Sequence, residues 1–74
     1  MSKKSELKKA IAESEKELEL LEKKRSRSQS ALVEAVVANV KPDDEDIKYF
    51  QVYTSLIQVE RENLHKLKEE LEKL

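Results

Sequence analysis

Pro42 is the only proline in a chain of 74 residues that contains no glycine, and it separates two segments in which apolar residues recur at helical spacing. Proline disfavours α geometry at the residue before it and has no N–H to donate, so it ends a helix. Without glycine, the chain has few positions for tight turns. We therefore expect one domain over residues 1–74, with a helix over 3–40, a turn at 41–43 and a helix over 44–74.

Residues that favour helix N-termini stand at both expected starts. Ser2 can cap the first helix, and Asp43 or Asp44 can cap the second. Their side-chain oxygens accept hydrogen bonds from N–H groups of the first turn. Glu45 and Asp46 follow, and carboxylates there interact favourably with the positive end of the helix.

Each expected helix carries a heptad stripe suited to pairing with the other. The stripe of the first helix is Ile11, Ser14, Leu18, Leu21, Arg25, Ser28, Leu32 and Ala35. The stripe of the second helix is Phe50, Tyr53, Ile57, Glu60, Leu64, Leu67, Leu71 and Leu74. Because the connection is short, the helices should lie antiparallel. The predicted fold class is all-α: an antiparallel two-helix hairpin, or coiled coil, that associates into a helical bundle.

Folding the helices together about Pro42 predicts which stripe residues meet. Leu21 then faces Leu64, and Arg25 faces Glu60 with opposite charge. We predict a seam ion pair between Arg25 and Glu60, worth less than about 1 kcal/mol where solvent reaches it. Its expected role is to fix the register of the two helices.

The apolar surface near the expected turn is wider than one helix pair can bury. On the second helix, Tyr49, Val52, Leu56 and Val59 form another stripe, offset from the heptad stripe. Large exposed apolar patches mark partner surfaces, and aromatic residues are enriched at interface anchors. The predicted partner-binding residues are Val33, Val37, Val40, Tyr49, Val52, Tyr53, Leu56 and Val59. The alternative is that the offset stripe folds beneath a curled helix end.

The sequence contains few of the residues that catalysis or cofactor binding requires. The chain has no cysteine, His65 is its only histidine, and a glycine-rich phosphate loop is impossible without glycine. The acidic residues 43–46 lack the alternate spacing and glycine of a calcium loop. We expect a protein that is not an enzyme and that has no cofactor and no metal site.

Charge and hydropathy also limit the partners. The net charge is −1 with interspersed signs, and the one basic run is Lys23, Lys24, Arg25 and Arg27. We interpret this run as a solvated helix face; nucleic-acid binding is the weaker alternative. The start of the chain has no apolar signal region, and no apolar stretch is long enough to cross a membrane. A soluble, cytoplasmic protein without membrane insertion is expected.

A serine-rich segment follows the basic run. Ser30 comes after Arg25 and Arg27, and arginines at such positions are recognised by basic-directed kinases. The alternative is a polar break in the stripe that helps to set the register. The sequence does not decide whether Ser26, Ser28 or Ser30 is phosphorylated.

The segment Phe50–Tyr53, Phe-Gln-Val-Tyr, resembles the Tyr-Gln-x-aromatic segment that begins the second helix in one family of small helical hairpins. That family comprises the YscE-like cytoplasmic co-chaperones of type III secretion needle subunits. The resemblance covers about a third of the chain, and it ends at Glu60, Arg61 and Glu62, where the family tends to have Ala and Leu. It implies a heterodimer with a tetratricopeptide-like partner that together sequesters the needle protein.

The leucine-rich end of the second helix, residues 64–71, is similar to the Rho-binding HR1 finger, another antiparallel coiled coil. The glycine typical of the first helix of that finger is absent here. We therefore expect a non-catalytic interaction module with a protein partner, in a homodimer or in a heterodimer with another helical protein. A needle co-chaperone is the favoured identity, and a regulatory binder of a small GTPase or similar switch protein is the alternative.

Overall fold

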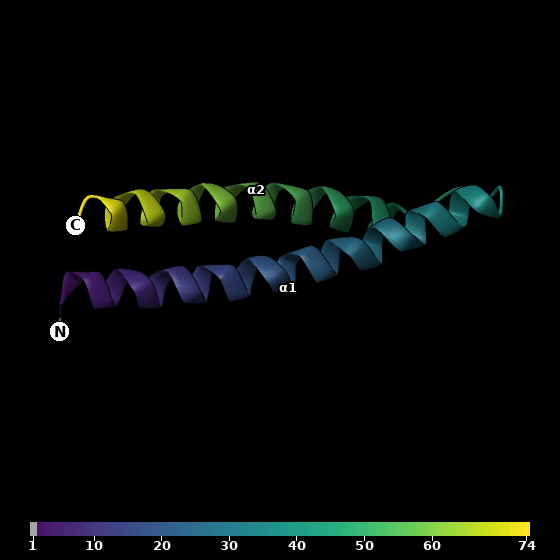
Figure 1. Ribbon diagram of the computed structural model, residues 1–74. Helices are drawn as coiled ribbons and strands as arrows, with labels where there is room; N and C mark the ends of the chain where they lie inside the picture. The colour runs from purple at the N-terminus through teal and green to yellow at the C-terminus, as the bar shows by residue number, and fades with distance from the viewer. Residues whose placement is uncertain (1) are drawn as a thin grey trace.

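The computed structural model describes residues 2–74 as two helices, α1 (Lys3–Val37) and α2 (Asp44–Glu72), joined by residues 38–43. The helices pack against each other in opposite directions, so the two ends of the described chain lie together and the connection lies at the far end (Figure 1). The molecule measures 55 × 16 × 14 Å. Among residues 2–74 there is no strand. The predicted antiparallel two-helix hairpin is confirmed.

Both helices begin at side-chain caps. The Ser2 hydroxyl accepts a hydrogen bond from the Ser5 backbone N–H at 3.1 Å. At the start of α2 the cap is Asp43, whose carboxylate accepts from the Glu45 N–H at 3.2 Å. Each cap has an extended backbone, as N-cap residues usually do.

The end of α1 differs from the prediction, because the helix stops at Val37 and not at residue 40. Asn39 adopts the left-handed conformation with a φ of 56°. The N–H of Asn39 donates to the Val36 carbonyl at 3.1 Å, and that of Val40 donates to Ala35 at 3.0 Å. These two bonds form a Schellman motif, which satisfies carbonyls that the last turn leaves without partners. The helix therefore ends at an asparagine before it reaches Pro42. At the other end of the molecule, α2 stops at Glu72 and not at residue 74.

The interface between the helices follows the two predicted heptad stripes. Every predicted stripe residue is buried or half-buried except Leu74, which lies beyond the end of α2 and is exposed. The buried apolar residues are Leu7, Ile11, Leu21 and Ile57. Ile57 is the most enclosed, with 1% of its surface exposed. The hairpin core is therefore one narrow strip along the seam.

The hairpin exposes more surface than a compact protein of its mass. Its accessible surface is 5978 Å², whereas a compact monomer of 8.6 kDa exposes about 4,700 Å². The excess follows from the shape, since two helices cover each other on one side only. Much of each helix is consequently available for contact with another molecule.

We predict that the stability of the hairpin depends on the conformation of residue 39. Asn39→Val should lower the free energy of unfolding by about 1–2 kcal/mol, because a β-branched residue tolerates positive φ poorly. Asn39→Gly should leave stability unchanged or slightly raised, since glycine is the usual residue at this position. Urea denaturation at one fixed chain concentration measures both variants. Equal free energies of unfolding for Asn39→Val and Asn39→Gly would contradict the left-handed conformation of residue 39.

Candidate partner-binding surface

Two stripes run side by side along the first half of α2, and they face different directions. The inner stripe, Phe50, Tyr53, Ile57 and Glu60, is buried or half-buried against α1. The outer stripe is Tyr49, Val52, Leu56 and Val59. Each of these residues directly precedes an inner-stripe residue in the sequence, and all four are exposed. Because each residue turns an α-helix by about 100°, α1 can cover only the inner stripe. The outer stripe is an apolar surface that the hairpin leaves in contact with solvent.

The outer stripe is open to solvent along its whole length. The exposed fractions are 48% for Tyr49, 42% for Val52, 45% for Leu56 and 63% for Val59. The Tyr49 ring stacks on that of Tyr53, with centroids 6.2 Å apart and an interplanar angle of 23°. Tyr53 is half-buried and belongs to the inner stripe. This stacking holds one end of the exposed surface against the hairpin core. The alternative that a curled helix end covers the stripe is wrong.

The predicted partner-binding residues of α1 are also exposed. Val33 is exposed, Val37 stands at the last position of the helix, and Val40 lies in the connection. Val36, which was not among the predicted residues, is 73% exposed. The turn-proximal end of α1 therefore carries a second apolar patch made of valines.

Val33 and the outer stripe lie on different sides of the hairpin. On one side, Glu22 reaches across to Arg61, with a carboxylate–guanidinium distance of 3.5 Å. Val33 follows Glu22 by three helical turns on α1, and it lines a hollow with Ser26 and Gln29 on that side. Among the predicted partner-binding residues, Val33 therefore lies on the side of the Glu22–Arg61 pair.

The outer stripe belongs to the opposite side. Leu56 lies two turns before Asn63 on α2, and Asn63 lines a groove with Ser14 and Glu60. Asn63 is two positions from Arg61, so their side chains point in nearly opposite directions around the helix. The outer stripe therefore places its four exposed apolar residues on one side of α2, away from the Glu22–Arg61 pair.

A polar pair crosses the seam, but it is not the predicted one. The Ser14 hydroxyl donates to Glu60 Oε1 at 2.6 Å, and Ser14 is only 4% exposed. The predicted ion pair between Arg25 and Glu60 is wrong, since Arg25 is in no ion pair among residues 2–74. The early end of α1 moves the positions that face α2 toward the N-terminus of α1, which is the direction of the change from Arg25 to Ser14. Glu60 thus contacts a residue in the N-terminal half of α1.

Arg25 lies instead in a groove on the Arg61 side of the hairpin. The groove has a volume of about 500 Å³, and its floor is Ile57. Its lining residues are Arg25, Thr54, Ile57, Gln58, Arg61, Glu62, His65 and Lys66. Two of these residues already have carboxylate partners, Arg61 with Glu22 and His65 with Glu69 at 2.7 Å. The groove is therefore a mixed-charge surface, without an uncompensated cluster of one sign.

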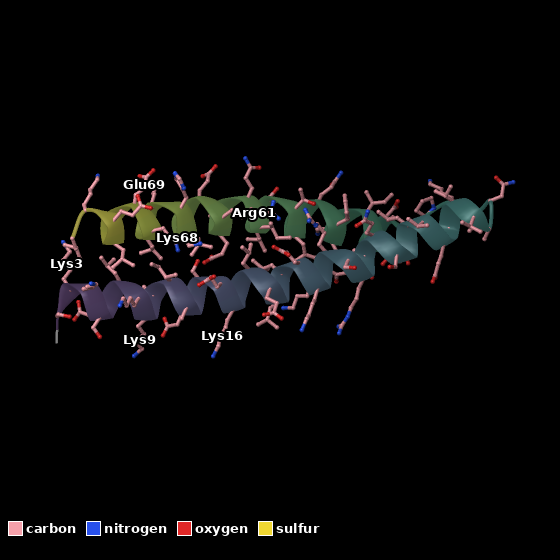
Figure 2. All side chains as sticks on the ribbon, in the orientation of Figure 1. Lys3, Lys9, Lys16, Arg61, Lys68 and Glu69 are labelled. Carbon is pink, nitrogen blue, oxygen red and sulfur yellow. The ribbon has the colours of Figure 1, made fainter. Side chains whose placement is uncertain are left out.

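The charged ends of the hairpin carry side chains that extend into solvent. Figure 2 shows Lys9 and Lys16 pointing away from α2, and Glu69 pointing away from α1. Lys23 of the basic run pairs with Glu19 within α1 at 3.6 Å, and both side chains are exposed. Such exposed pairs contribute little stability, typically below about 1 kcal/mol. Leu20, which sequence analysis did not single out, is 51% exposed between these charges.

Metal-ligand clusters and membrane-spanning helices are both absent from residues 2–74. Within residues 2–74, no three His, Cys, Asp or Glu side chains are grouped so that they could hold a metal ion. Neither α1 nor α2 contains a stretch apolar enough to cross a bilayer.

Comparison with known proteins finds no matching family model, no matching curated protein and no matching solved structure. The similarity of Phe50–Tyr53 to the needle co-chaperones and that of residues 64–71 to the Rho-binding finger thus remain predictions.

We predict that Glu60 is energetically coupled to Ser14 and not to Arg25. A double-mutant cycle of Ser14→Ala with Glu60→Met should give a coupling of about 1 kcal/mol, because the hydroxyl donates to a half-buried carboxylate and methionine removes the accepting oxygens. The matched cycle of Arg25→Ala with Glu60→Met should give a coupling near zero. Urea denaturation at constant chain concentration supplies the free energies. A larger coupling to Arg25 than to Ser14 would restore the register predicted from Pro42.

Proposed function

We propose that this chain is a non-catalytic protein–protein interaction module that binds a helical partner through the outer stripe of α2. The observation that carries the proposal is the exposure of Tyr49, Val52, Leu56 and Val59 in one line along α2. Their 3-4-3 spacing is that of a coiled-coil seam, and such a seam suits another helix. The excess accessible surface of the hairpin is further support.

The absence of catalytic equipment supports the non-catalytic part of the proposal. One histidine and no cysteine leave no nucleophile with a neighbouring base, and His65 is exposed and paired with Glu69. We further propose a cytoplasmic location, because neither α1 nor α2 contains a stretch apolar enough to cross a membrane.

Among known families, the co-chaperones of type III secretion needle subunits are our preferred specific identity. The resembling segment, Phe50–Tyr53, contains Val52 of the outer stripe and lies where the apolar residues are exposed. The partner would then be a tetratricopeptide-like helical protein. The alternative, a binder of a small GTPase, rests on residues 64–71, and the exposed apolar surface lies elsewhere on α2.

The first test is the mass of the purified chain. We predict a dimer or larger species at micromolar concentration, because burying four apolar side chains, at up to roughly 1.5–3 kcal/mol each, can offset much of the cost of association. Light scattering over a dilution series measures the mass, and circular dichroism measures the helicity. A fully helical monomer over that range would shift the proposal to a different helical partner.

The second test locates the binding surface. Leu56→Asp should weaken association by a factor of more than about 100 while the hairpin stays helical, because a carboxylate would have to be desolvated in the interface. The matched control is Glu69→Lys with Lys73→Glu, two exposed positions at the other end of α2, and it should leave association nearly intact. Loss of binding in the control, together with intact binding in Leu56→Asp, would place the functional surface at the charged ends and refute the proposal.

A further inference from the structure

The outer stripe has the length and spacing of a short coiled-coil seam. Its four apolar residues alternate in steps of three and four, and the next positions in the same pattern are Glu45 before it and Asn63 after it. The apolar part is therefore bounded by polar residues at both ends. It spans about 15 Å along the helix axis, since ten residue steps of 1.5 Å separate Tyr49 from Val59.

We infer that the outer stripe is covered by the outer stripe of a second copy of this chain, with the two α2 helices antiparallel. This inference rests on the proposed function, in which the outer stripe binds a helix. A two-fold axis between Val52 and Leu56 places each of these residues against the other in the second copy. It also places Tyr49 against Val59, a large side chain against a small one. A parallel arrangement would instead stack Tyr49 on Tyr49 and leave Val52 against Val52.

Charge complementarity favours the antiparallel arrangement. Lys48 and Glu62 flank the outer stripe on the same edge, one near each end, and both are exposed. In the antiparallel pair, Lys48 of one copy lies beside Glu62 of the other, and symmetry creates this pair twice. Just beyond the stripe, Lys66 of one copy approaches the acidic turn at Asp43 of the other. All of these approaches join opposite charges.

The parallel arrangement would bring like charges together. In register, Glu45 of each copy would meet Glu45 of the other at the start of the seam, and Lys66 would meet Lys66 at its end. Like charges at facing positions suppress a pairing mode. The like charges at Glu45 and Lys66 therefore disfavour the parallel orientation of the same apolar contact.

The first arm of the test is a charge swap. Lys48→Glu and Glu62→Lys should each raise the dissociation constant of the dimer on the order of tenfold, because each places two like-charged pairs across the interface. The double variant should bind about as tightly as the unmodified chain, since the pairs are restored with reversed sign. The matched control is Lys9→Glu, whose side chain points away from α2 (Figure 2) and should change nothing.

The second arm determines the relative orientation of the two α2 helices. Because the chain has no cysteine of its own, each variant carries a single thiol. Glu45→Cys and Asn63→Cys are prepared separately, mixed after denaturation, refolded together and treated with a short bis-maleimide. The antiparallel dimer should give a crosslinked product between the two different variants and little product from either variant alone. Electrophoresis of the three samples, with circular dichroism to verify helicity, gives the result.

Failure of this inference differs from failure of the proposed function. Efficient crosslinking of each single variant to itself, or failure of the double charge variant to recover affinity, would overturn the antiparallel pairing and leave the outer stripe as the binding surface. A helical monomer at all concentrations would overturn the second copy as the occupant. Association that survives Leu56→Asp but not the reversal of Glu69 and Lys73 would overturn the proposed function itself.

Discussion

Two helices share only one interface, and every other feature of this molecule depends on that limit. A helix in a hairpin can bury the stripe that faces its partner, while the rest of its circumference stays in water. Here the shared interface encloses only a few side chains, with Ile57 at its centre. The second apolar stripe of α2 cannot be covered within the chain. α2 thus has more apolar residues than the hairpin can bury, and that surplus is the physical basis for the proposed binding role.

Buried serines make the interface between the two helices less stable than apolar residues would at the same positions. Ser14 and Ser28 are buried in the middle of the interface, where leucine would contribute more apolar burial. Ser14 donates to Glu60, whereas Ser28 turns back to the Lys24 carbonyl of its own helix at 3.4 Å. A buried polar contact between two helices penalises every register in which the partners do not meet. The Ser14–Glu60 bond therefore specifies the alignment of α1 and α2 more than it strengthens their contact.

The stripes were predictable from the sequence, whereas the alignment was not. Heptad spacing is a local property, so residues such as Leu21 and Ile57 could be assigned to the seam without knowledge of the fold. The register depends on where α1 ends, and the end was set by Asn39 in a left-handed conformation, which is only modestly favoured for asparagine. α1 ended before the predicted residue, and Glu60 met Ser14 in place of Arg25. The exposure of Leu56 was predictable, because α2 has two apolar stripes and α1 can cover only one of them. That Val33 lies on the other side of the hairpin from Leu56 could be seen only in the structure.

The excess surface of the hairpin has a consequence for its thermodynamics. The heat-capacity increment of unfolding and the dependence of stability on denaturant both scale with the surface that unfolding newly exposes. A chain that already leaves 5978 Å² accessible in its folded state has less left to expose than a compact domain of equal length. Its stability curve should be correspondingly flat with temperature and its denaturant transition broad. Any partner that covers the outer stripe would steepen both, because the complex hides surface that the isolated hairpin leaves hydrated.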